Sequence, residues 1–178
     1  MRITISGTPG SGKSTLAGNL QRALGYPYLN AGQVFREAAA KRKMSLAEFA
    51  ALVDQTPGLD RALDARLVAK ARRHANLILE GRLAGWLTKR ARLSAFRIWV
   101  TAKEPERVAR LMQREGGTRE ETLRRLRIRA RGERKRYLRN YGIDSSSLAP
   151  YDVVIRTDHR TPEQVAARIL SAIHAKGS

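Results

Sequence analysis

The sequence contains no cysteine, which excludes disulfides, thiolate metal sites and a cysteine nucleophile. It also lacks any run approaching the roughly 20 apolar residues that a membrane-spanning helix needs. The first ten residues, MRITISGTPG, have no apolar core long enough for a signal peptide. These absences favour a cytoplasmic protein that has no membrane partner.

Acidic residues are scarce, with 16 Asp and Glu against 35 Lys and Arg, which gives a net charge of +19. An excess of this size predicts anionic partners such as nucleotides or nucleic acid. The composition is otherwise that of an ordinary globular protein, with 42% hydrophobic and 29% charged residues. A length of 178 residues predicts a single domain over residues 1–178.

Short apolar segments alternate with helical patterns along the chain. The strands are predicted at residues 2–6, 27–30, 77–79, 96–100 and 152–156. Helical patterns lie between them, and Ser45 with Glu48 forms a capping box before one of the helices. This alternation predicts an α/β fold in which helices cover both faces of a parallel sheet. Trp99, within a strand, is expected in the core, and Trp86 is expected to pack against the loop after Arg82.

A phosphate-binding motif follows the first predicted strand. The residues Gly7-Thr8-Pro9-Gly10-Ser11-Gly12-Lys13-Ser14 match G-x-x-x-x-G-K-[ST]. Glycines let the backbone N–H groups curl around an anion, and the start of the next helix adds its dipole. The other interpretation is a glycine-rich turn that binds nothing, which the position between strand and helix disfavours. The residues predicted to bind ATP are Gly7, Gly10, Ser11, Gly12, Lys13, Ser14 and Thr15.

A magnesium site is predicted beside this loop, from Ser14 and Glu80. Glu80 ends the strand at 77–79, and the carboxyl ends of parallel strands face the ligand in doubly wound sheets. The alternative is a structural carboxylate paired with Arg82 or Arg36. Since no Asn-Lys-x-Asp motif occurs and the chain is short for a motor protein, small-molecule and nucleotide kinases remain the favoured class.

Further motifs extend over nearly the whole chain. They are AGQVFRE (31–37), MSLAEFA (44–50), LDRALDAR (59–66), LEGRLAGW (79–86), ARLMQREG (109–116), RYLRNYGID (136–144) and YDVVI (151–155). With these motifs the chain resembles the archaeal-type cytidylate kinases, a family of nucleoside monophosphate kinases. The resemblance implies a P-loop NTPase fold with a five-stranded parallel sheet, a monophosphate-binding arm at residues 31–75 and a lid at residues 118–140. It implies transfer of the ATP γ-phosphate to CMP, and to dCMP, with Mg²⁺. We expect a monomer.

The resemblance also assigns roles to single residues. Lys13, Arg82, Arg129 and Arg136 are implied to be catalytic, and the implied acceptor-binding residues are Gly32, Phe35, Arg36, Arg82 and Glu133. The chemistry of phosphoryl transfer is compatible with these arginine roles. The acceptor phosphate is already anionic, so it needs positioning and charge neutralisation rather than a strong base. The open alternative for each arginine is a surface pair with a carboxylate. Ala130 departs from the family, which usually has an acidic residue there.

Recognition of cytosine requires a carboxylate or carbonyl opposite the amino group of the base. Asp60 and Asp64 match the arm segment of the family and are candidates for this contact. The alternative is that both carboxylates only complement the dipole of the helix they begin. Sequence reasoning leaves the two interpretations open.

Two other functions remain open. One is a kinase for a different monophosphate, AMP or UMP, with the same fold. The other is an RNA- or ribosome-associated ATPase, which the charge of +19 and the basic segment at 119–139 favour. We also predict weak, sequence-independent RNA binding through that segment, involving Arg124, Arg127 and Lys135.

Overall fold

The structure is a computed structural model and describes residues 1–177. The elements in chain order are β1 (Arg2–Gly7), α1 (Lys13–Leu24), β2 (Tyr28–Asn30), α2 (Ala31–Lys41), α3 (Leu46–Gln55), α4 (Pro57–Arg73), β3 (Leu77–Glu80), α5 (Ala84–Arg90), β4 (Phe96–Thr101), α6 (Glu104–Glu115), α7 (Arg119–Tyr141), β5 (Val153–Arg156) and α8 (Pro162–Gly177). All five predicted strands are present. None of the helices in this described part is long and apolar enough to span a membrane.

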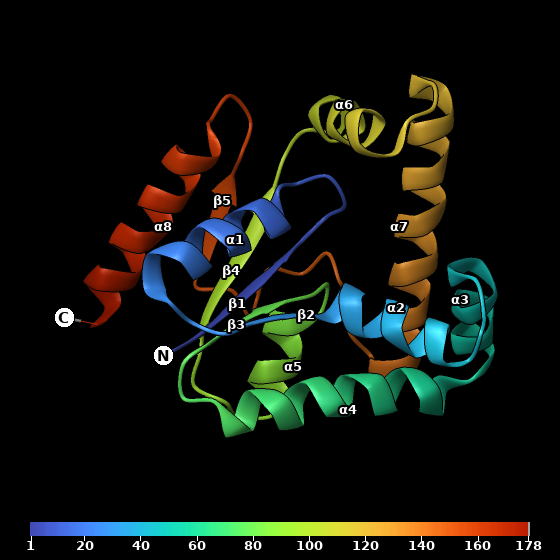
Figure 1. The fold of residues 1–178 in the computed structure, drawn as a ribbon, viewed down its shortest axis with the longest axis horizontal. Helices are drawn as coiled ribbons and strands as arrows, with labels where there is room; N and C mark the ends of the chain where they lie inside the picture. Colours follow the sequence, from blue (N-terminus) through green and yellow to red (C-terminus); the bar gives the residue numbers. More distant parts are fainter. Residues whose placement is uncertain (178) are drawn as a thin grey trace.

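The strands form one sheet in the order β2-β3-β1-β4-β5, and every neighbouring pair is parallel. Helices lie on both faces (Figure 1). Alternate residues of the central strands supply two cores. Ile3, Ile5 and Ile78 pack with α1 and α8 on one face, whereas Leu77 and Leu79 pack with α4 and α5 on the other. The predicted five-stranded α/β sheet is therefore confirmed.

Helices α2, α3 and α4 have a small core of their own. Phe49 and Val53 are fully buried there, and the rings of Phe35 and Phe49 meet edge to face with centroids 4.7 Å apart. The predicted capping box of Ser45 and Glu48 begins α3. These three helices therefore pack on one another at one end of the segment between β2 and β3, while the C-terminal half of α4 packs against the sheet.

Helix α7 is the longest of the described helices, with 23 residues, and stands apart from the sheet, with its C-terminal half beside α2 and α3 (Figure 1). It begins with a capping box formed by Thr118 and Glu121 and ends at Gly142 in the left-handed conformation. Its few buried residues include Leu126 and Tyr137. Tertiary contacts therefore decide its position, since most of its surface is exposed.

The two tryptophans differ in their surroundings. Trp86 lies in α5 and packs against a cluster that includes Leu83, the residue after Arg82. Trp99 is only partly buried, because its side of β4 faces Tyr151 rather than the main core, and the two rings are tilted with centroids 5.0 Å apart.

Candidate active site

The phosphate loop joins β1 to α1 at the carboxyl end of the sheet. Two of its glycines are required by close approach of the backbone, since a Cβ on Gly7 would lie 2.0 Å from the carbonyl oxygen of Val100 and one on Gly10 would lie 2.7 Å from that of Arg107. Gly12 caps α1 in the left-handed conformation and gives it no side-chain hydrogen bond. The first N–H groups of α1 thus remain free for an anion.

Lys13 begins α1 beneath this loop. Its ammonium donates a hydrogen bond to the carbonyl oxygen of Thr8 at 2.8 Å. Burial, together with the neighbouring charge of Arg82, lowers the pKa of Lys13 to about 7. A nearby anion would stabilise the charged form, so the geometry suits a residue that meets phosphate oxygens.

Glu80 ends β3 and is held by neighbours on both sides. Ser14 Oγ donates to Glu80 Oε1 at 2.8 Å, and Asn30 Nδ2 donates to Glu80 Oε2 at 2.7 Å. The hydroxyl of Tyr28 donates to the same carboxylate, and burial with this contact raises the pKa of Tyr28 to about 12. The partners of Glu80 are therefore Ser14, Tyr28 and Asn30, rather than Arg82 or Arg36.

The oxygens of Ser14 and Glu80 are the candidate protein ligands for Mg²⁺. Among the described residues no group of three His, Cys, Asp or Glu could enclose a metal ion. Mg²⁺ usually takes only one or two protein oxygens and completes its shell with waters and phosphate oxygens. The Ser14 hydroxyl and the Glu80 carboxylate, beside the phosphate loop, fit an ion that arrives with a nucleotide.

Arg82 follows β3 and points back at the phosphate loop, where its Nη1 donates to the carbonyl oxygen of Gly7 at 3.1 Å. Its Nε lies 3.3 Å from Glu133 Oε2, and the Nε of Arg129 lies 3.0 Å from Glu133 Oε1. Burial lowers the pKa of Arg82. Glu133 thus joins an arginine of the sheet region to an arginine of α7.

Arg136 lies two helical turns beyond Arg129 and faces α3 and α4. Its Nη1 is 3.2 Å from Asp54 Oδ1, and its Nε is 3.7 Å from Asp60 Oδ2. Its guanidinium also lies over the ring of Tyr137, 5.2 Å from the centroid. These contacts hold α7 against α3 and α4.

Asp60 and Asp64 meet the C-terminal end of α7. Asn140 Nδ2 donates to Asp60 Oδ2 at 3.0 Å, and the hydroxyl of Tyr141 donates to Asp64 Oδ2 at 2.5 Å. Burial and the charge of Asp60 raise the pKa of Asp64 to about 6. If Asp60 and Asp64 only complemented the dipole of α4, they would not need these contacts with α7. Sequence reasoning missed Asn140, a buried asparagine within the RYLRNYGID motif.

The three predicted acceptor residues of α2 behave differently from one another. Phe35 packs on Phe49 in the core of the arm. Arg36 is exposed and has no ion pair or hydrogen bond within residues 1–177, so its guanidinium is available to an anion. A Cβ on Gly32 would lie 3.0 Å from Asn30 Oδ1 and 3.5 Å from Arg36 Nη1. The tight contact is thus with Asn30, the residue that caps α2.

Arg110 of α6, which sequence reasoning missed, lies beside the phosphate loop. Arg110 donates to Thr157 through two hydrogen bonds, at 2.8 Å to Oγ1 and 3.1 Å to the carbonyl oxygen. It lines a cavity of about 190 Å³ with Gly12, Thr15 and Arg160. This cavity therefore lies beside the start of α1. The presence of Arg110 in the ARLMQREG motif was the available signal in the sequence.

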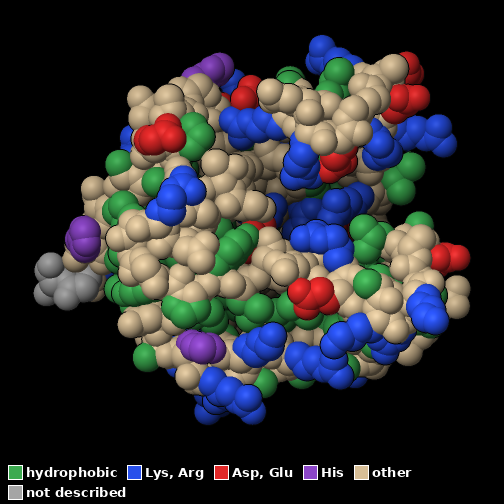
Figure 2. Space-filling view, in the orientation of Figure 1, with side chains coloured by type: hydrophobic (Ala, Val, Ile, Leu, Met, Phe, Trp, Pro, Cys, Tyr) green, Lys and Arg blue, Asp and Glu red, His purple; other side chains and the backbone are tan. Residues whose placement is uncertain are grey.

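The surface of the molecule has a basic hollow in this region. Figure 2 shows Lys and Arg side chains gathered in a hollow between the sheet region and α7, with few acidic groups beside them. A phosphate loop, a buried lysine and several converging arginines at the carboxyl end of a β2-β3-β1-β4-β5 sheet define a P-loop kinase.

Comparison with known proteins narrows this class. Residues 2–159 match the cytidylate kinase-like family, and the chain belongs to that family. It is 40% identical to a cytidylate kinase of Thermoplasma volcanium, over 97% of this chain and 91% of that one. It is 42% identical to a cytidylate kinase of Pyrococcus abyssi, over 96% and 92% of the two chains. An uncharacterized protein from Eubacterium ventriosum has the same fold, with a TM-score of 0.73, 15% identity and 98% of each chain covered.

Proposed function

We propose that this chain transfers the γ-phosphate of ATP to CMP, producing CDP and ADP, and that dCMP is a second acceptor. The observation that carries the proposal is the convergence of the phosphate loop, Lys13 and Arg82 at one point of the sheet edge. Two relatives of similar length that are named cytidylate kinase support CMP as the acceptor.

In the proposed reaction, an oxygen of the CMP phosphate attacks the γ-phosphorus. The bond from that phosphorus to the β–γ bridging oxygen breaks, and ADP leaves with the electron pair. The attacking oxygen is already negatively charged, so no general base is needed. The protein has to align the two nucleotides, neutralise their charge and exclude water.

In our proposal, cations from three parts of the chain align the two nucleotides and neutralise their charge. Lys13 contacts the β- and γ-phosphates, and Arg82 with Arg36 holds the acceptor phosphate through bidentate contacts. Arg129 and Arg136 approach the transferring group from α7. Without nucleotides, Glu133 is the counter-ion for Arg82 and Arg129, and we expect phosphate oxygens to replace its carboxylate.

Mg²⁺ would be held by Ser14 and Glu80, whose oxygens lie 2.8 Å apart. The ion would neutralise part of the charge on the donor phosphates. Tyr28 and Asn30 hold the Glu80 carboxylate in its orientation, which leaves the Ser14 side of the group directed at the phosphate loop. Their role in this proposal is to position Glu80.

For the acceptor base, we propose that Asp60 and Asp64 accept from the amino group of cytosine. Their present partners, Asn140 and Tyr141, belong to the end of α7. Residues 31–75 then act as the monophosphate-binding arm and residues 118–140 as the lid. All of these groups lie in one chain, in keeping with catalysis by a monomer.

The proposal is tested by measuring ADP release from ATP with CMP, dCMP, UMP or AMP as the acceptor. The highest kcat/KM is expected with CMP, and Lys13→Ala should abolish release with every acceptor. A clear preference for UMP or AMP would assign a different substrate. Release that rises with RNA and needs no monophosphate would instead support an RNA-associated ATPase.

A further inference from the structure

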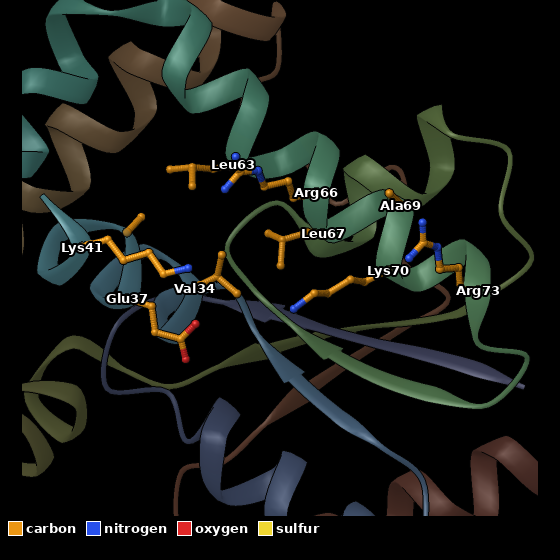
Figure 3. Close-up of a pocket in the computed structure, with 10 residues that line it drawn as sticks. Val34, Glu37, Lys41, Leu63, Arg66, Leu67, Ala69, Lys70 and Arg73 are labelled. Carbon is orange, nitrogen blue, oxygen red and sulfur yellow. The ribbon is translucent and has the colours of Figure 1, made fainter.

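A groove lies between α2 and α4, outside the hollow described above. Its volume is about 350 Å³, and apolar residues of both helices, including Val34 and Leu67, form its floor (Figure 3). Lys41 and Lys70 extend into the space between the helices from opposite sides (Figure 3). Gly32, Arg36, Asp60 and Asp64 do not line it, so the groove uses different faces of these helices from the proposed acceptor site.

Cations dominate the groove and are unpaired. Lys41, Arg66, Lys70 and Arg73 line it and are exposed, and within residues 1–177 none of them has an ion pair or hydrogen bond. The single acidic residue that lines it, Glu37, accepts a hydrogen bond from Gln33 Nε2 at 3.1 Å. Four cations against one carboxylate leave an excess of positive charge that nothing in the described fold neutralises.

Several cations of α7 differ from those of the groove, because they have partners within the chain. Arg127 pairs with Glu104 at 2.9 Å, and Arg134 pairs with Asp144 at 2.8 Å. Arg125 donates to the carbonyl oxygen of Gly116 at 3.1 Å. Much of the positive charge at 119–139 is therefore used in contacts within the chain, which weakens the expectation that α7 is the main surface for a polyanion.

The arrangement of the groove favours a ligand with several phosphates. Arg66, Lys70 and Arg73 share one face of α4 at spacings of four and three residues, and they rise about 10 Å along its axis. A row of that length exceeds a single phosphate, and Lys41 adds a cation on the opposite wall. The apolar floor can contact a sugar or base, but no aromatic side chain lines the groove to stack on a base.

We propose that the groove between α2 and α4 binds single-stranded RNA through its phosphates, without sequence preference. A flexible single strand can bring successive phosphates to cations on both walls, whereas a rigid duplex holds its phosphates in fixed positions. This function is separate from phosphoryl transfer. Four neutralised phosphates predict a slope of about −3 for log K against log salt.

The test is fluorescence anisotropy of a labelled twelve-nucleotide oligouridine at 50 to 200 mM salt. The groove variant combines Lys41→Gln, Arg66→Gln and Lys70→Gln. The matched control combines Arg124→Gln, Arg131→Gln and Lys135→Gln, which removes the same charge from exposed, unpaired residues of α7. The groove variant should lower affinity at 50 mM salt by at least about 10-fold and reduce the slope by about 2, with CMP phosphorylation unchanged.

The control should keep most of the affinity and slope of the parent. Equal losses in both variants would overturn the proposal, because net charge and not the groove would then explain binding. Absence of binding by the folded parent at 50 mM salt would overturn it as well. Two competitors test the kind of ligand. If tripolyphosphate displaces the labelled oligouridine as well as unlabelled oligouridine does at equal phosphate concentration, the groove is a site for small anions and the proposal fails. If an RNA duplex binds with equal affinity, the groove has no preference for single strands.

Discussion

Asp64 is predicted to make the stability of this protein depend on pH. Its pKa is raised from 3.8 to about 6 by burial and by the charge of Asp60. Because the folded state holds this proton more tightly than the unfolded state, the native protein loses stability as the pH rises from about 4 to about 7. A rise of this size corresponds to about 3 kcal/mol, since one pKa unit is worth about 1.4 kcal/mol.

Asp64→Asn removes the ionisation and keeps an oxygen that can accept from Tyr141. The difference in unfolding free energy between variant and parent should therefore shift in favour of the variant by about 3 kcal/mol between pH 4 and pH 8. Urea unfolding followed by circular dichroism at several pH values measures this difference. Comparison with the parent cancels the titration of the other carboxylates.

Asp144→Asn is the control with the opposite sign. Contacts with Ser146 and Arg134 lower the pKa of Asp144 to about 2, so its contribution is present above pH 4 and is lost as the pH falls toward 2. This variant should be less stable than the parent at neutral pH and approach it in acid. A difference between Asp64→Asn and the parent that does not change with pH would refute the reasoning for Asp64.

Other substitutions test the site. Arg82→Ala should lower kcat/KM for CMP by about 30- to 1000-fold, equivalent to about 2–4 kcal/mol, with ATP affinity much less affected. If binding titrations show equal losses of affinity for both nucleotides, the role of Arg82 is structural. Glu80→Gln should raise the Mg²⁺ concentration needed for half-maximal rate by about 10-fold or more, as measured by metal titration of turnover; an unchanged requirement would exclude Glu80 as a ligand. Lys13→Ala should abolish turnover with an unchanged Tm, and near-normal turnover would reject the phosphate-loop assignment.

Local sequence determined most of the elements. The eight residues of the phosphate loop contain their own chemistry, because glycines, a lysine and a hydroxyl within one turn need only a preceding strand and a following helix. The apolar alternation of residues 2–6 and the capping box at Ser45 are also local signals. Helix α5 was not predicted, because its seven residues are too few to show a helical periodicity in the sequence.

The partners of the charged residues were decided only by tertiary structure. Parallel pairing of β2 with β3 brings Tyr28 and Asn30 to Glu80, 52 and 50 residues away in sequence. The fold also sets Glu133 between Arg82 and Arg129. It leaves the cations of the α2–α4 groove unpaired, whereas several of those on α7, such as Arg127 and Arg134, find carboxylates. A sequence reveals how many charges a protein has, but Coulomb attraction and hydrogen bonding act over a few ångströms, and only the folded chain fixes which groups are that close.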